Sequence, residues 1–170
     1  LGWPELGLPG LASLLCELKH PQALAYLECA SKAFVESTAY RSPNSEVLNS
    51  MRQLVGQEEN WTAGFDPIPV LSSILYFTED EEIPTWGRYI KFLEGKMQFE
   101  RVVQLALELP KLVPSATSLP LYFLHRSRQH IRDYEAVLQI VDVQMKKQQD
   151  IPICYRMRAY CFKMMGQQVE

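Results

Sequence analysis

Residues 133–147, DYEAVLQIVDVQMKK, are followed directly by QQDIPICYRMRAYCFKMMGQ at residues 148–167. Apolar side chains in the first stretch recur at helical spacing and share one face: Val137, Leu138, Val141 and Met145. The second stretch opens with Pro152 in the first turn of a helix and closes at Gly166, two positions that these residues favour. The pattern therefore predicts two helices joined by a short turn.

Helical periodicity continues along the whole chain, and alternating strand patterns are nearly absent. We expect about nine helices, near residues 11–18, 21–38, 42–55, 70–77, 85–94, 97–109, 118–129, 132–148 and 152–165. Ser42 and Thr85 are the expected N-caps, Gly95 is an expected helix end, and Pro110 is expected to interrupt a helix. Helices joined by such short turns predict an all-α fold with antiparallel neighbours.

The chain also contains an internal echo. The segment Phe99-Glu100-Arg101-Val102 aligns with Tyr134-Glu135-Ala136-Val137 at a spacing of 35 residues, and a tight turn precedes each. A similar turn and helix occur near the start, in KHPQALAYLECA. A two-helix period near 34–35 residues is the signature of stacked helical hairpins.

Residues 85–170 resemble the tetratricopeptide (TPR) family and its relative, the pentatricopeptide (PPR) family; residues 10–38 fit loosely and residues 56–84 do not fit. The TPR likeness is carried by Tyr134, Ala136, Val137, Ala159, Phe162 and Gly166. Met145 followed by Ile151-Pro152 is closer to the PPR pattern. The resemblance implies a right-handed array of stacked hairpins, with ligands bound along its first helices. The alternative is an irregular helical bundle, since helices of this length give a similar spacing by chance.

Composition is that of one globular domain: 170 residues, 47% hydrophobic and 22% charged. QEENWTAGFDPIP, within residues 56–69, is the best internal boundary because it contains two prolines and Gly64. Because the first residue is Leu1, we expect a fragment of a longer protein. No apolar run is long enough to cross a membrane, and the N-terminal segment lacks the basic start of a signal peptide.

The residues that carry chemistry are sparse. The four cysteines include no CxxC pair, which predicts buried reduced thiols and an intracellular, nuclear or cytoplasmic location. His125 and His130 are five residues apart and diverge by about 140° around a helix, so they are poorly placed to share a metal. The sequence has no glycine-rich phosphate loop, HExxH or GxSxG motif. We expect no catalytic, metal or cofactor site, and hence a protein that is not an enzyme.

Charge is unevenly distributed around a net value of −3. Residues 1–87 carry four basic and twelve acidic side chains, whereas residues 88–170 carry thirteen basic and eight acidic ones. The acidic run Glu79-Asp80-Glu81-Glu82 is typical of a solvated loop. The alternatives are a docking patch for a basic peptide or an internal complement to basic residues.

The basic segment HRSRQHIR contains Arg126, Arg128 and Arg132, and the next first helix carries Arg156 and Arg158. If the hairpins stack, these arginines converge on one surface, where guanidinium groups bind carboxylates or phosphates. The alternative is a solvated helix end in which arginine favours the helix dipole.

The leading functional hypothesis is a protein-interaction scaffold that binds a peptide or helix of a partner within a multi-subunit complex. One alternative is single-stranded RNA binding by a PPR-like array, although the isoelectric point near 5.7 disfavours it. The other is a helical accessory domain of a larger enzyme.

Overall fold

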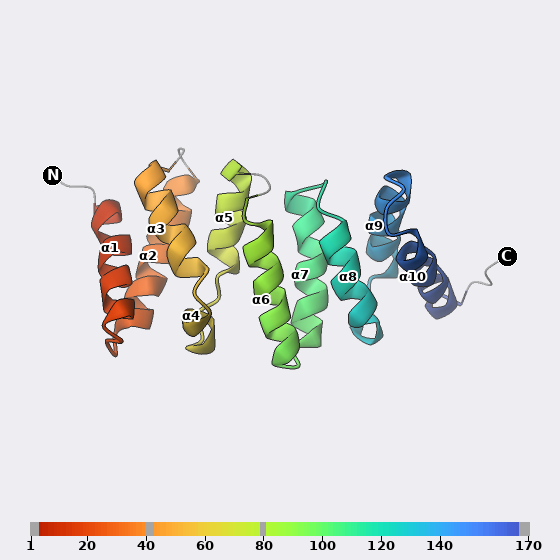
Figure 1. Cartoon of the computed structure of the whole chain (residues 1–170), viewed down its shortest axis with the longest axis horizontal. Coiled ribbons are helices and arrows are strands. Elements are labelled where there is room, and N and C mark those ends of the chain that lie inside the picture. The colour runs from red at the N-terminus through yellow and green to blue at the C-terminus, as the bar shows by residue number, and fades with distance from the viewer. Residues whose placement is uncertain (1–3, 40–42, 79–80, 167–170) are drawn as a thin grey trace. The chain divides into compact units, whose positions relative to one another are not determined.

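A computed structural model describes residues 4–39, 43–78 and 81–166. The described residues form ten α-helices and one short 3-10 helix, with no strand (Figure 1). This confirms the all-α fold. Among the same residues, no helix combines the length and apolar character needed to cross a bilayer.

The helices have the following bounds: α1 Pro4–Glu17, α2 Ala23–Thr38, α3 Ser45–Val55, α4 Glu58–Thr62, α5 Ile68–Thr78, α6 Ile83–Gly95, α7 Phe99–Leu112, α8 Ser118–Arg126, the 3-10 helix η1 Arg128–His130, α9 Tyr134–Lys146 and α10 Ile151–Met164. Helices α7 and α9 begin at Phe99 and Tyr134, so the spacing of 35 seen in the sequence is a spacing of helix starts.

The chain divides into two compact units, Leu1–Tyr89 and Ile90–Glu170, and α6 contributes residues to both. Residues 56–69, the expected boundary, hold α4 and the loop before α5 inside the first unit. That residues 1–170 form a single domain stays a prediction.

The first unit is built from two helical pairs. Helix α1 packs on α2, and α3 packs on α5; α1 also contacts α3, and α2 contacts α5. The helices thus form two layers, α1 with α3 and α2 with α5. Apolar residues that recur at helical spacing fill the space between these layers, among them Leu27, Met51, Leu54, Leu71 and Ile74.

The second unit repeats this plan. Helix α7 packs on α8 and α9 on α10, while α8 contacts α10 and α7 contacts α9. Its core includes Leu105, Leu109, Leu121, Leu124 and Met157. Stacked helical pairs are therefore present within each unit. The finer TPR-like, right-handed geometry of the whole chain stays a prediction.

Contacts between neighbouring helices of one layer follow a fixed register. Hydrogen bonds join groups 32 residues apart: Arg88 with Gly56, Arg126 with Glu94, Lys147 with Ser115, Ser118 with Asp150, and Tyr160 with Arg128. Helices α6 and α8 begin 35 residues apart, at Ile83 and Ser118. A residue of α6 therefore contacts the residue 32 positions later, whereas the helix starts are 35 positions apart. The difference of three residues is about one helical turn.

Several helix ends differ from the sequence prediction. Pro110 lies inside α7, which continues to Leu112. Thr85 lies within α6, which already begins at Ile83. The expected cap Ser42 is outside the described residues, and α3 is instead capped by Asn44, whose side chain accepts a hydrogen bond from the Glu46 amide at 2.9 Å.

Left-handed residues mark the turns within three helical pairs. Lys19, Met97 and Gln148 have φ values of 50°, 60° and 57° and follow α1, α6 and α9. After α6, the amide of Gln98 donates to the carbonyl of Leu93, which satisfies an otherwise orphaned end group. Helix α6 thus ends at Gly95, as expected, and the left-handed residue of the following turn is Met97.

Helix α4 was not expected and is fixed by tryptophan. The indole Nε1 of Trp61 donates to the carbonyl of Val55 at 2.8 Å, and the ring packs edge-on against Tyr89. Arg88 lies over the same ring and donates to the carbonyl of Gly56 at 2.7 Å. These contacts hold α4 against the C-terminal end of α3. At five residues, α4 is too short to be recognised from hydrophobic periodicity.

Candidate functional site

The five arginines singled out in the sequence divide into paired and unpaired groups, all in the second unit. Arg126 donates from Nε to the Glu94 carboxylate at 2.6 Å and lies over the Tyr122 ring. The hydrogen bond to Glu94 is the main cause of its raised pKa. This arginine therefore links α8 to α6 and is already occupied.

Two more of the five have acidic neighbours. Arg158 on α10 pairs with Asp142 on α9. Arg132 lies 3.9 Å from Glu100, but both side chains are highly exposed, so water screens this contact. Arg158 is thus directed toward α9. The sequence had suggested that it would share a surface with the arginines near the end of α8, and it does not.

Arg128 and Arg156 have no carboxylate partner within the described part of the chain. Arg128 lies on η1, directly after α8, and its backbone carbonyl accepts a hydrogen bond from the Tyr160 hydroxyl at 2.9 Å. That bond fixes the end of α8 against α10, the helix that carries Arg156. Both guanidinium-bearing side chains are exposed.

The guanidinium of Arg128 donates at 3.4 Å to the backbone carbonyl of His125. Its imidazole is half-buried in the last turn of α8. Its pKa is lowered from the usual 6.5, first by desolvation and then by the charges of Arg128 and Arg156. We call His125, Arg128 and Arg156 the basic cluster. Because its cations repel a further proton rather than neutralise a carboxylate, the cluster favours an incoming anion.

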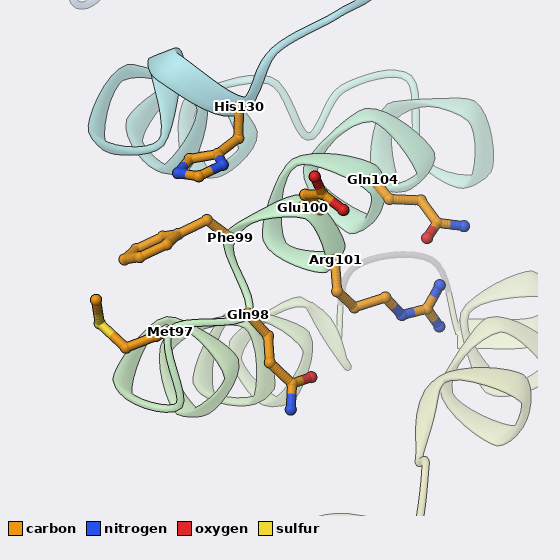
Figure 2. A pocket seen from close by; sticks show the side chains of 7 residues that line it. All are labelled: Met97, Gln98, Phe99, Glu100, Arg101, Gln104 and His130. Carbon is orange, nitrogen blue, oxygen red and sulfur yellow. The ribbon is translucent and has the colours of Figure 1, made fainter.

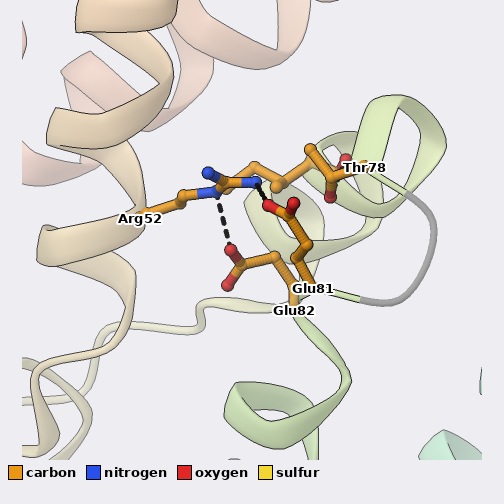
Figure 3. A network of polar contacts seen from close by, with 5 residues as sticks. Arg52, Thr78, Glu81 and Glu82 are labelled. Carbon is orange, nitrogen blue, oxygen red and sulfur yellow. Dashed lines mark hydrogen bonds and ion pairs between the residues drawn. The ribbon is translucent and has the colours of Figure 1, made fainter.

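The acidic run has a different role from the basic cluster. Arg52 on α3 donates a hydrogen bond to Glu81 and forms an ion pair with Glu82, the residue before α6, with Nε 2.7 Å from the carboxylate (Figure 3). Glu82 is only 6% exposed. These two carboxylates thus form an internal ion pair within the first unit; Glu79 and Asp80 lie outside the described residues.

A shallow hollow of about 610 Å³ borders the start of α7 (Figure 2). Its most regular feature is the stacking of the Phe99 and His130 rings, with centroids 5.0 Å apart and an angle of 17°. The remaining lining residues are Met97, Gln98, Glu100, Arg101 and Gln104. This mixed lining includes one imidazole and one carboxylate, and it presents no convergent set of groups for catalysis.

Two of the four cysteines are too deeply buried for nucleophilic chemistry. Cys154 and Cys161 are fully buried, and burial raises the pKa of Cys161 to about 11. The expectation of buried thiols is wrong for Cys29, which is exposed, and only partly right for the half-buried Cys16. The described residues also contain no group of three His, Cys, Asp or Glu side chains suited to hold a metal ion.

Sequence reasoning found the arginines but missed what distinguishes them. Tyr160 was not singled out, although its hydroxyl fixes Arg128. His125 was recognised as part of the basic segment, but the lowering of its pKa by Arg128 and Arg156 was not predicted. The separation of 32 residues between Arg128 and Tyr160 would have identified the contact, had the layer register been known.

No family model, curated protein or solved structure matches this chain. What the site binds must therefore be inferred from its chemistry.

Proposed function

We propose that the chain is a non-enzymatic protein-interaction domain whose basic cluster binds an acidic segment of a partner protein in a multi-subunit complex. The observation that supports this most directly is that Arg128 and Arg156 are exposed and have no carboxylate partner among the described residues, while both lower the pKa of His125. Neighbouring arginines of the same unit, Arg126 and Arg158, do have such partners.

The chemistry of the cluster suits carboxylates. A guanidinium group presents several N–H donors in a fixed plane and binds a carboxylate through two parallel hydrogen bonds. Two such groups, held on η1 and α10, can engage successive acidic residues of an extended or helical segment. Tyr155, which precedes Arg156 on α10, is an exposed aromatic that can add apolar contact.

Binding can be measured by fluorescence anisotropy of a labelled oligoglutamate peptide. The double substitution Arg128→Glu and Arg156→Glu should weaken binding by about tenfold or more, because it replaces two attractive charges with repulsive ones. Circular dichroism should show an unchanged fold, since both side chains are exposed.

The matched control is Lys111→Glu with Lys146→Glu. These exposed lysines lie on α7 and α9 of the same unit, and the control changes the net charge equally. Equal losses in both variants would show that net charge, not the cluster, governs binding. Tighter, steeply salt-dependent binding of an oligouridylate to the unmodified chain, lost in the cluster variant, would assign the cluster to RNA instead.

A further inference from the structure

The first unit has a groove along the seam between α2 and α5. It consists of two adjoining hollows of about 460 and 400 Å³, and both include Val35 in their lining. The larger hollow lies beside residues 28–36 of α2 and 64–70 of the loop and α5. The smaller one lies beside residues 35–39 and 72–77. We call the two hollows together the α2–α5 groove.

The dimensions of the groove suit a helix. Along it, α2 and α5 advance in the same direction, because both residue ranges rise from the larger hollow to the smaller. Residues 28–39 span about 16 Å at 1.5 Å per residue, which is three turns of an α-helix. A third helix laid along two parallel helices packs its side chains into the depression between them.

The lining of the groove is apolar, and one end carries an unusual aromatic pair. Val35 and the exposed Pro69 line the larger hollow, with Phe65 and Val70 buried beneath them. At the other end, Tyr76 is 82% exposed and meets Phe77 edge-on, with ring centroids 5.2 Å apart. A tyrosine this exposed gains little from folding, whereas aromatic residues of this kind are common anchors in protein interfaces.

The charged side chains of the groove are mainly acidic. Glu28 and Glu36 lie one turn to either side of Lys32 on α2, and Asp66 lies opposite in the loop before α5. All three carboxylates belong to the larger hollow, while the smaller hollow is lined only by uncharged residues. An occupant therefore meets negative charge at one end and the aromatic pair at the other.

From this charge distribution we propose that the α2–α5 groove binds a basic amphipathic helix of a partner protein. Its apolar face lies against Val35 and Pro69, its lysine or arginine residues meet Glu28 and Glu36, and an apolar residue near its other end packs on Tyr76. This site is independent of the basic cluster: it lies in the other unit and takes a segment of opposite charge.

The probe is a labelled helical peptide made only of leucine and lysine at amphipathic spacing. A peptide of the same composition, with its order scrambled to remove the apolar face, serves as the reference. Anisotropy titration of the full chain should give at least tenfold tighter binding of the amphipathic peptide. Equal binding of both peptides would overturn the proposal, because the groove would then recognise charge alone.

Glu28→Lys with Glu36→Lys should weaken binding of the amphipathic peptide by about tenfold or more, since these exposed carboxylates meet its lysines. The matched control is Glu17→Lys with Glu59→Lys, two exposed carboxylates of the same unit that do not line the groove. The control should bind as the unmodified chain does. An equal loss in both variants would overturn the site.

Tyr76→Ala provides a second test that leaves the charge unchanged. It should weaken peptide binding several-fold without changing the unfolding midpoint, because the ring is mostly exposed. Unchanged affinity in this variant would overturn the assignment of the aromatic pair as an anchor.

Further arms separate other occupants. If unlabelled chain competes with the peptide and sedimentation shows a dimer, the occupant of the groove is a second copy of the chain, and the proposed partner helix is wrong. If the chain binds phosphatidylserine vesicles more strongly than the peptide, the groove binds a membrane surface, and the proposed partner helix is wrong. Arg128→Glu with Arg156→Glu should leave peptide binding intact, so failure of the basic cluster and failure of the groove are distinguishable.

Discussion

The two units contain arginines that differ in whether they have carboxylate partners. In the first unit, Arg52 lies between two carboxylates, one of them buried, and joins α3 to the start of α6. In the second, Arg128 and Arg156 are exposed, and neither forms an ion pair with a carboxylate of the described residues. Transferring a charge from water to a protein interior costs free energy, so a buried charge must be paired. An exposed charge stays solvated and can bind a group of another molecule. The comparison separates arginines that hold the fold from arginines that can serve binding.

The largest expected effects concern the cores of the two units. Leu71→Ala in the first and Leu121→Ala in the second each remove a buried side chain, and each should lower the free energy of unfolding by about 3 kcal/mol. Because α6 contributes residues to both units, we expect a single urea transition that either substitution shifts as a whole. Two transitions, each shifted by only one substitution, would show two independent domains.

The next effect sharpens the difference between buried and exposed ion pairs. Glu82→Ala leaves the guanidinium of Arg52 without its buried partner and should cost about 2 kcal/mol in urea unfolding. Glu81→Ala removes a partner whose side chain is 67% exposed and should cost less than about 0.5 kcal/mol. Equal costs would mean that burial does not distinguish the two carboxylates.

The smallest effect is on the basic cluster itself. His125 should titrate below 6.5 in a proton NMR titration, and Arg128→Ala with Arg156→Ala should raise its pKa by removing two repelling charges. In the window just below pH 6.5, the unfolded chain takes up this proton more readily than the folded chain. Stability should therefore fall slightly as the pH drops through that window, and His125→Gln should abolish this component. A His125 resonance that titrates above 6.5 would contradict the cluster geometry.

The fold was largely predictable because helical periodicity is a local signal. Buried Val102, Val137 and Val141 recur at the spacing that the sequence shows, and the predicted correspondence of Phe99 and Tyr134 is that of two helix starts. The missed features depend on contacts outside the local pattern. Helix α4 is held by the hydrogen bond of Trp61, and the α6–α7 turn has its left-handed residue at Met97, where no glycine marks it in the sequence.

The candidate site was predictable only in composition. The segment from His125 to Arg132 and the pair Arg156 and Arg158 are visibly basic, but each arginine's partner lies on a different helix. Arg126 meets Glu94 across 32 residues and Arg158 meets Asp142 across 16. Neither separation follows from the period of 35, because the axial displacement of neighbouring helices is set by packing.

The sequence by itself determined that the chain forms short antiparallel helices with opposite charge in its two halves, since periodicity and charge are properties of the local residue order. Only the tertiary structure decided which charges are neutralised. Packing brings Glu94 to Arg126 and Asp142 to Arg158, leaves Arg128 and Arg156 without a carboxylate partner among the described residues, and opens a groove between α2 and α5. Side chains far apart in sequence meet through packing, and packing depends on the whole helical arrangement rather than on any one stretch.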